Sequence, residues 1–135
     1  EQSRRLYQFA IELGMAFQLQ DDLLDSYGGE ELGKTIGGDI LEGKKSYLMV
    51  TAMSRADEEQ REGLRHTYKD AALAPAEKIA RVRAVFDALD VPRLTEQQIS
   101  LRFDRALATL DGLNVPDARK EPLREYARSL MGRRK

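Results

Sequence analysis

Apolar residues recur every three or four positions along the first 26 residues, which predicts a long helix over about 3–26. Further apolar residues fill much of the circumference beside the main stripe, so the predicted helix is buried on most of its sides. These apolar positions are Leu6, Phe9, Ala10, Ile11, Leu13, Met15, Phe17, Leu19 and Leu24.

The polar exceptions on this helix also follow a helical spacing. Gly14, Gln18, Asp21 and Asp25 lie three or four residues apart, so they share one narrow stripe. On a helix that is otherwise buried, such a stripe must face something polar.

A glycine-rich link over 27–38 follows this helix. Asp39 and Glu42 then have the spacing of a capping box, which predicts a second helix from 39 to about 53. Two consecutive lysines would lie in or near the first turn of that helix.

The remaining pattern predicts four further helical segments, and no stretch alternates with a period of two for long enough to form a strand. The segments are a charged, solvated stretch over 56–70 interrupted at Gly63, a helix from Pro75 to a break at 90–92, a helix capped by Thr95 that ends near Gly112, and a last helix with Pro122 near its start. We therefore expect an all-α chain of roughly five to seven helices.

Composition narrows the possible functions. The 135 residues suit one domain, and 22 basic against 23 acidic residues give no global field that would recruit nucleic acid or an anionic membrane. The chain has no cysteine, which excludes disulfides and thiolate metal sites and permits a cytoplasmic location. It has no run of about 18 apolar residues and no leader pattern, so we expect no membrane span. Because the sequence starts at Glu1 without methionine, already in a strongly apolar pattern, we expect a fragment.

Three carboxylates crowd the end of the first predicted helix. Asp21, Asp22 and Asp25 repel one another near the negative end of the helix dipole, and a bound cation would reverse that cost. Carboxylate oxygens without neighbouring histidine or cysteine favour magnesium or manganese over zinc. Magnesium usually binds through one or two carboxylates plus substrate phosphates, so the pattern implies a phosphorylated ligand.

Lysines follow the carboxylates at short range. Lys34 lies in the glycine-rich link, and Lys44 and Lys45 follow the predicted capping box. Ammonium groups are natural counter-ions for phosphate oxygens, so metal and lysines would hold the same group from two sides.

At these residues the sequence resembles a known family. FQLQDDLLD followed by GK, GGD and GKKSYL resembles the second aspartate-rich motif of the trans-polyprenyl diphosphate synthases, which include farnesyl and geranylgeranyl diphosphate synthases. The resemblance implies the all-α isoprenoid synthase fold. It also implies that this chain is the C-terminal half of a single helical domain whose N-terminal half, with the first aspartate-rich motif, is absent here.

The resemblance assigns roles to individual residues. Asp21 matches a direct magnesium ligand, while Asp22 and Asp25 complete the acidic patch directly, through water, or by holding a lysine. Lys34 and Lys44 match the lysines that hold the allylic diphosphate. The metal set implied is Asp21, Asp22 and Asp25, and the catalytic set is Asp21, Asp22 and Lys34.

Other implied features concern substrates and assembly. Phe17 and Gln18 match residues that line the reacting region, and Asp39 matches a carboxylate behind the metal ligands. The activity implied is condensation of an allylic diphosphate with isopentenyl diphosphate by magnesium-assisted ionisation, in a homodimer. Without its first acidic motif the chain should not catalyse alone and would need the missing half or a second copy of itself.

Two rival hypotheses remain at this point. One is a non-catalytic helical interaction subunit, or a fragment of the family that dimerises through an exposed core face. The other is a terpene cyclase, against which the paired lysine motifs argue.

Overall fold

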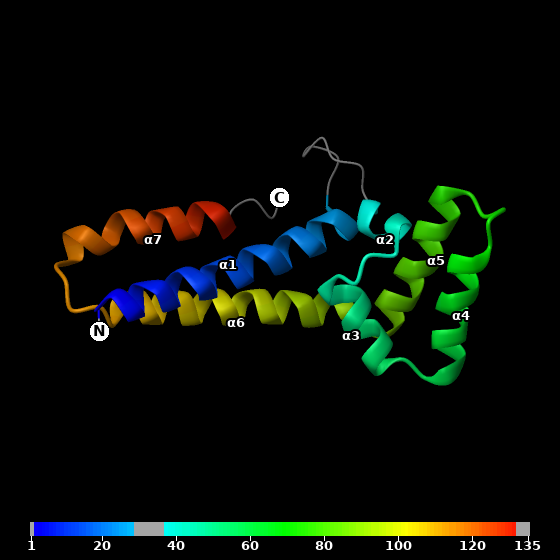
Figure 1. Ribbon diagram of the computed structural model, residues 1–135, viewed down its shortest axis with the longest axis horizontal. Helices are drawn as coiled ribbons and strands as arrows, with labels where there is room; N and C mark the ends of the chain where they lie inside the picture. The colour runs from blue at the N-terminus through cyan, green and yellow to red at the C-terminus, as the bar shows by residue number, and fades with distance from the viewer. Residues whose placement is uncertain (1, 29–36, 132–135) are drawn as a thin grey trace. The chain divides into compact units, whose positions relative to one another are not determined.

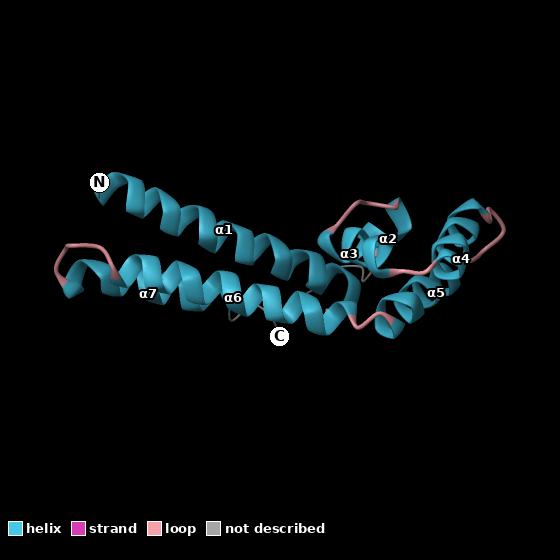
Figure 2. Ribbon diagram, turned by 90° about the horizontal axis from the view of Figure 1, so that it is seen from below, coloured by secondary structure: helices cyan, strands magenta, loops and turns pink. Residues whose placement is uncertain are grey.

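The computed structural model describes residues 2–28 and 37–131, and every regular element in these ranges is an α-helix (Figures 1 and 2). The prediction of an all-α fold is therefore confirmed. No helix in the described ranges is long and apolar enough to cross a membrane. The helices are α1 (Gln2–Tyr27), α2 (Gly38–Glu42), α3 (Tyr47–Arg55), α4 (Glu58–Lys69), α5 (Pro75–Ala88), α6 (Val91–Asp111) and α7 (Asp117–Met131).

The chain divides into two compact units, with residues 22–95 forming one and the flanking segments forming the other. In the unit of flanking segments, most of α1 lies alongside α6 and α7 (Figure 1). Apolar side chains from all three helices and from the turn after α6 meet in one cluster, whose burial supplies the main stabilisation of this unit. Its buried members are Phe9, Leu13, Ala106, Leu110, Leu113 and Ala127.

Polar contacts fix how these three helices align. Glu12 accepts a hydrogen bond from the Thr109 hydroxyl at 2.7 Å, which joins α1 to α6. The buried Gln20 side chain donates to the Leu130 carbonyl at 2.9 Å, which joins α1 to α7. Because a slipped register would leave these polar groups unpaired, the bonds specify one alignment.

In the unit over 22–95, α5 is the element against which α2, α3 and α4 all pack. The buried apolar residues of this unit come from all four of these helices and from the start of α6. They include Ile40, Leu48, Ala52, Leu64, Val82, Phe86 and Val91.

The predicted single helix over 39–53 is wrong, because the chain forms two helices there. Gly43 adopts a left-handed conformation with φ 70°, which ends α2. Ser46 then caps α3, accepting the Met49 N–H at 3.3 Å. The predicted capping box at Asp39 is also wrong, since Gly37 precedes α2 and supplies no side-chain cap. The two lysines therefore lie in the turn between α2 and α3.

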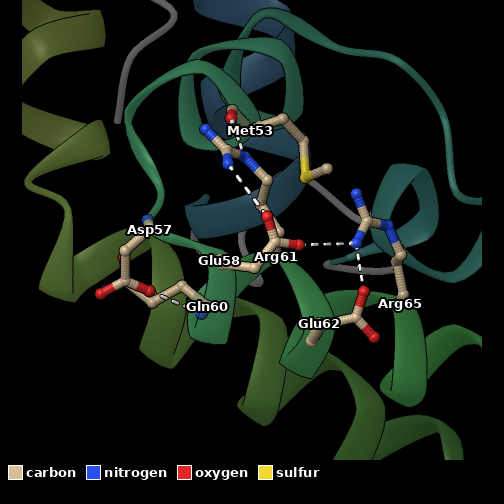
Figure 3. Close-up of polar contacts among 7 residues, drawn as sticks. All are labelled: Met53, Asp57, Glu58, Gln60, Arg61, Glu62 and Arg65. Carbon is tan, nitrogen blue, oxygen red and sulfur yellow. Dashed lines mark hydrogen bonds and ion pairs between the residues drawn. The ribbon is translucent and has the colours of Figure 1, made fainter.

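The predicted interruption at Gly63 is wrong as well, because α4 runs through it. A capping box starts this helix: Asp57 accepts the Gln60 N–H at 2.7 Å, and the Gln60 side chain accepts the Asp57 N–H at 3.0 Å (Figure 3). The cost of one glycine in a helix interior is about 1 kcal/mol, which this start and the burial of Leu64 offset.

Two other boundaries differ from prediction. Thr95 lies inside α6, where its hydroxyl donates to the Val91 carbonyl at 2.8 Å, because the turn at Asp90 with φ 62° lets the helix start earlier. Pro122 lies inside α7 and not near its start, since Asp117 begins that helix. The first helix, by contrast, matches its predicted bounds closely.

Gly37 and Gly63 provide a matched test of this fold. Gly37 has φ 90°, and a Cβ there would lie 2.6 Å from Ile79 Cδ1, whereas a Cβ at Gly63 meets no atom within 4 Å. We predict that Gly37→Ala lowers the free energy of unfolding by about 1–3 kcal/mol. Gly63→Ala should raise it by about 0.5–1 kcal/mol. Urea denaturation measures both, and a neutral Gly37→Ala would contradict the described packing of α2 on α5.

Candidate functional site

The C-terminal turns of α1 carry the three predicted carboxylates, and each has a different environment. Asp22 is nearly buried, with 6% of its surface exposed. One of its oxygens, Oδ2, accepts the backbone N–H of Tyr47 at 3.1 Å. Tyr47 is the first residue of α3, so its N–H has no partner within that helix. Asp22 thus holds the start of α3 against the end of α1.

Asp25 does the same for α2. Its Oδ2 accepts the backbone N–H of Asp39 at 2.7 Å, and its backbone carbonyl accepts the N–H of Gly37. Both bonds reach across the glycine-rich link, so the end of α1 fixes where the chain resumes at α2.

Lys44 lies beside two of the carboxylates. Its Nζ is 3.8 Å from Asp22 Oδ1 and 3.6 Å from Asp39 Oδ2, and 47% of the side chain is exposed. The negative charge of Asp39, and then that of Asp22, raises the pKa of Lys44 above its usual value. The lysine is therefore charged at neutral pH, while its exposed part can still donate to an anion.

The surroundings of Asp39 disfavour the charged form of its carboxyl. Burial raises the pKa of its carboxyl above the usual value, the nearby charge of Asp25 raises it further, and Lys44 acts in the opposite direction. Burial and the neighbouring carboxylates thus disfavour the ionised form of Asp39, and the ammonium of Lys44 favours it.

Asp21 differs from its neighbours because one of its oxygens has no partner. Oδ1 is buried and forms no hydrogen bond with any residue in the described part of the chain. A buried carboxylate oxygen left unpaired is costly, and a bound cation is one way to satisfy it. The oxygen fits the chemistry of a magnesium ligand. Within residues 2–28 and 37–131, however, no three His, Asp or Glu side chains converge as a complete metal site, and the predicted metal set stays a prediction.

The remaining predicted site residues lie along α1 or outside the described ranges. Phe17 is half-buried and Gln18 is exposed, both within α1 and one turn before Asp21. Lys34 falls within 29–36, outside the described residues. The structure therefore brings together Asp22, Asp25 and Lys44, with Asp39, and leaves the role of Lys34 as a prediction.

Sequence reasoning missed a clamp that holds the last turn of α1 on α5. The Arg83 Nε donates to the Ser26 carbonyl at 2.7 Å, and its guanidinium lies 5.3 Å from the centre of the Tyr27 ring. The Tyr27 hydroxyl donates to Asp87 at 2.9 Å. Burial, and then the bond to Asp87, raises the pKa of Tyr27 above its usual value. The four-residue spacing places Arg83 and Asp87 on the same face of a helix, but it does not indicate that Ser26 and Tyr27 are their partners.

The bonds from Asp22 and Asp25 can be tested by amide hydrogen exchange. We predict that Asp22→Ala speeds exchange at the Tyr47 amide and Asp25→Ala speeds exchange at the Asp39 amide, each by about tenfold or more, because each loses a charge-assisted bond. Asp104→Ala, on the exposed surface of α6, is the control and should change neither. Unchanged protection at both amides would show that the carboxylates do not hold α2 and α3.

Comparisons with known proteins place this arrangement in a family. Residues 1–88 match the family model described as polyprenyl synthetase. Human farnesyl pyrophosphate synthase is 35% identical over 106 residues, which cover 78% of this chain and 25% of the human enzyme. Heptaprenyl diphosphate synthase component 2 of Geobacillus stearothermophilus is 37% identical over 120 residues, covering 86% of this chain and 35% of that protein.

A solved structure shares the fold. The crystal structure of a geranylgeranyl pyrophosphate synthase superposes with a TM-score of 0.83 at 29% identity, covering 97% of this chain and 41% of that one. The chain thus spans about a quarter to two-fifths of the length of these three relatives. The predicted resemblance is confirmed, and the chain belongs to the polyprenyl synthetase family.

Proposed function

We propose that this chain forms one side of the active site of a short-chain polyprenyl diphosphate synthase, of the farnesyl or geranylgeranyl type. It would grip the diphosphate of an allylic substrate, which then condenses with isopentenyl diphosphate. The observation that carries the proposal is the half-exposed Lys44 ammonium beside Asp22 and Asp39. Asp22 belongs to the end of α1 that carries Asp21, Asp22 and Asp25, which we call the acidic turn. One oxygen of Asp21 there is buried and has no hydrogen-bond partner among the described residues.

The residues present suit the departure of a diphosphate. The allylic C–O bond breaks and the diphosphate leaves with the electron pair, so negative charge grows on its oxygens. Lys44 and Lys34 would donate to those oxygens, which lowers the barrier because the leaving group is stabilised most in the transition state. Asp21, with Asp22 and Asp25, would hold magnesium or manganese, whose charge would add to that stabilisation.

The second half of the reaction needs no nucleophile from the protein. The double bond of isopentenyl diphosphate attacks the allylic cation and forms the new C–C bond, and the departing diphosphate takes the proton that is lost. Phe17 and Gln18 would line the region where the allylic carbon reacts. Asp22 and Asp25 would also position Lys44 and the helices that follow it, through the bonds described above.

An exposed apolar stripe on α1 supports a partner for this chain. Tyr7, Ile11 and Met15 are spaced four residues apart, and 69% of Tyr7 is exposed. Such a stripe is typical of a surface that another polypeptide covers. We propose that the N-terminal half of the domain, which would carry the first acidic motif, or a second copy of the chain covers this stripe, in a cytoplasmic homodimer.

The same stripe also favours a second candidate, a non-catalytic interaction subunit of the family. Mixing the purified chain with the missing half separates the two candidates. A catalytic half restores condensation of an allylic diphosphate with isopentenyl diphosphate, whereas an interaction subunit binds without turnover.

Two substitutions test the site in the complete enzyme. We predict that Asp21→Ala and Lys34→Ala each lower kcat by about a hundredfold or more with an allylic diphosphate, because each removes charge stabilisation of the leaving group. Arg105→Ala, at an exposed position of α6, is the matched control and should leave kcat unchanged. Near-normal turnover in both site variants would refute the assignment.

A further inference from the structure

A recess lies in the unit over 22–95, between α3 and α4, and we call it the α3–α4 groove. It is open and has a volume of about 630 Å³, within the range of small-molecule sites. Its apolar lining comes from one face of each helix. Met49 and Met53 are one turn apart on α3, and Leu64 and Tyr68 are one turn apart on α4. Figure 3 shows Met53 and Arg65, one from each side.

The apolar lining of the groove is partly open to solvent. Leu64 is buried at its floor, and Val50, at its edge, has 54% of its surface exposed. Methionine side chains adapt to apolar groups of different shapes, so Met49 and Met53 suit a flexible hydrocarbon chain.

The charged residues that line the groove are all basic: Lys45, Arg65 and Lys69. Arg65 is neutralised by ion pairs with Glu58 and Glu62 (Figure 3). Lys45 and Lys69 form no ion pair with any residue in the described part of the chain. Among the described residues, Lys45 and Lys69 are thus two cations without an ion-pair partner beside an apolar surface.

The groove is chemically distinct from the acidic turn. Lys44, the neighbour of Lys45, points its ammonium to Asp22 and Asp39, which do not line the groove. None of the described residues that line the groove is acidic, so they offer a metal no carboxylate. An anion in the groove would therefore bind without a divalent cation.

We propose that the α3–α4 groove binds a second prenyl diphosphate without metal, with its hydrocarbon chain on the apolar lining and its diphosphate at Lys45 and Lys69. An elongated apolar group that ends in an anion matches both the lining and the uncompensated charge. The choice of a prenyl diphosphate over other amphiphilic anions rests on the proposed function.

The test is calorimetric titration of the 135-residue chain in EDTA, which removes metal-dependent binding at the acidic turn. The ligands are dimethylallyl, geranyl and farnesyl diphosphate, with inorganic diphosphate and farnesol as the isolated head and tail. We expect affinity to rise by about tenfold with each added isoprene unit. The affinity of the groove for inorganic diphosphate, and its affinity for farnesol, should each be at least about a hundredfold lower than its affinity for farnesyl diphosphate.

Substitutions locate the binding. Val50→Asp and Lys69→Glu, both at exposed positions, should each weaken farnesyl diphosphate binding by about tenfold or more. Lys69→Arg keeps the positive charge and should bind as the wild type does. Arg105→Glu makes the same charge change as Lys69→Glu away from the groove and should have no effect. Far-UV circular dichroism and thermal midpoints verify that every variant is folded.

Several results would overturn the proposal. They are equal binding by the wild type and both groove variants, affinity that does not depend on chain length, and equally tight binding of a fatty acid of similar length. Sedimentation velocity adds one more: a dimer that Val50→Asp dissociates would make the groove an interface between copies of the chain. Lys44→Ala should leave this binding unchanged, so failure of the proposed activity and failure of the groove can be told apart.

Discussion

The carboxylates at the end of α1 impose the constraint on which the surrounding structure depends. Three like charges within five residues, at the negative end of a 26-residue helix, destabilise that helix unless something compensates each of them. Asp22 and Asp25 are compensated by backbone amides at the starts of α3 and α2, and Asp22 also by Lys44. The hydrogen bonds that compensate the charges of Asp22 and Asp25 therefore also attach α3 and α2 to the end of α1.

This arrangement means that the same residues have a structural role and the catalytic role that we propose. The bonds that hold α2 and α3 in place also hold the turn between them, and that turn carries Lys44. Arg83 and Asp87 hold the last turn of α1 from the other side, through Ser26 and Tyr27. The lysine that we propose for diphosphate binding is therefore positioned by carboxylates that its charge in turn stabilises.

The sequence predicted those parts of the fold that are determined by residues close together in the chain. The first helix was predictable because its apolar spacing is sustained over 26 residues, and the acidic turn with Lys44 was predictable because the motif is dense. The break between α2 and α3 was missed because the left-handed turn at Gly43 leaves no periodic signal. The bonds from Asp22 to Tyr47 and from Arg83 to Ser26 were missed because they join residues 25 and 57 positions apart, which no local pattern relates.

The central claim is that the acidic turn and Lys44 together bind a diphosphate with a divalent cation. The most direct test is calorimetry of inorganic diphosphate binding to the chain, with and without magnesium, for the wild type, Asp21→Asn and Lys44→Met. Our account predicts that magnesium tightens wild-type binding by about tenfold or more. It also predicts that Asp21→Asn removes this gain and that Lys44→Met weakens the binding measured with magnesium. The same magnesium dependence in Asp21→Asn as in the wild type would contradict it.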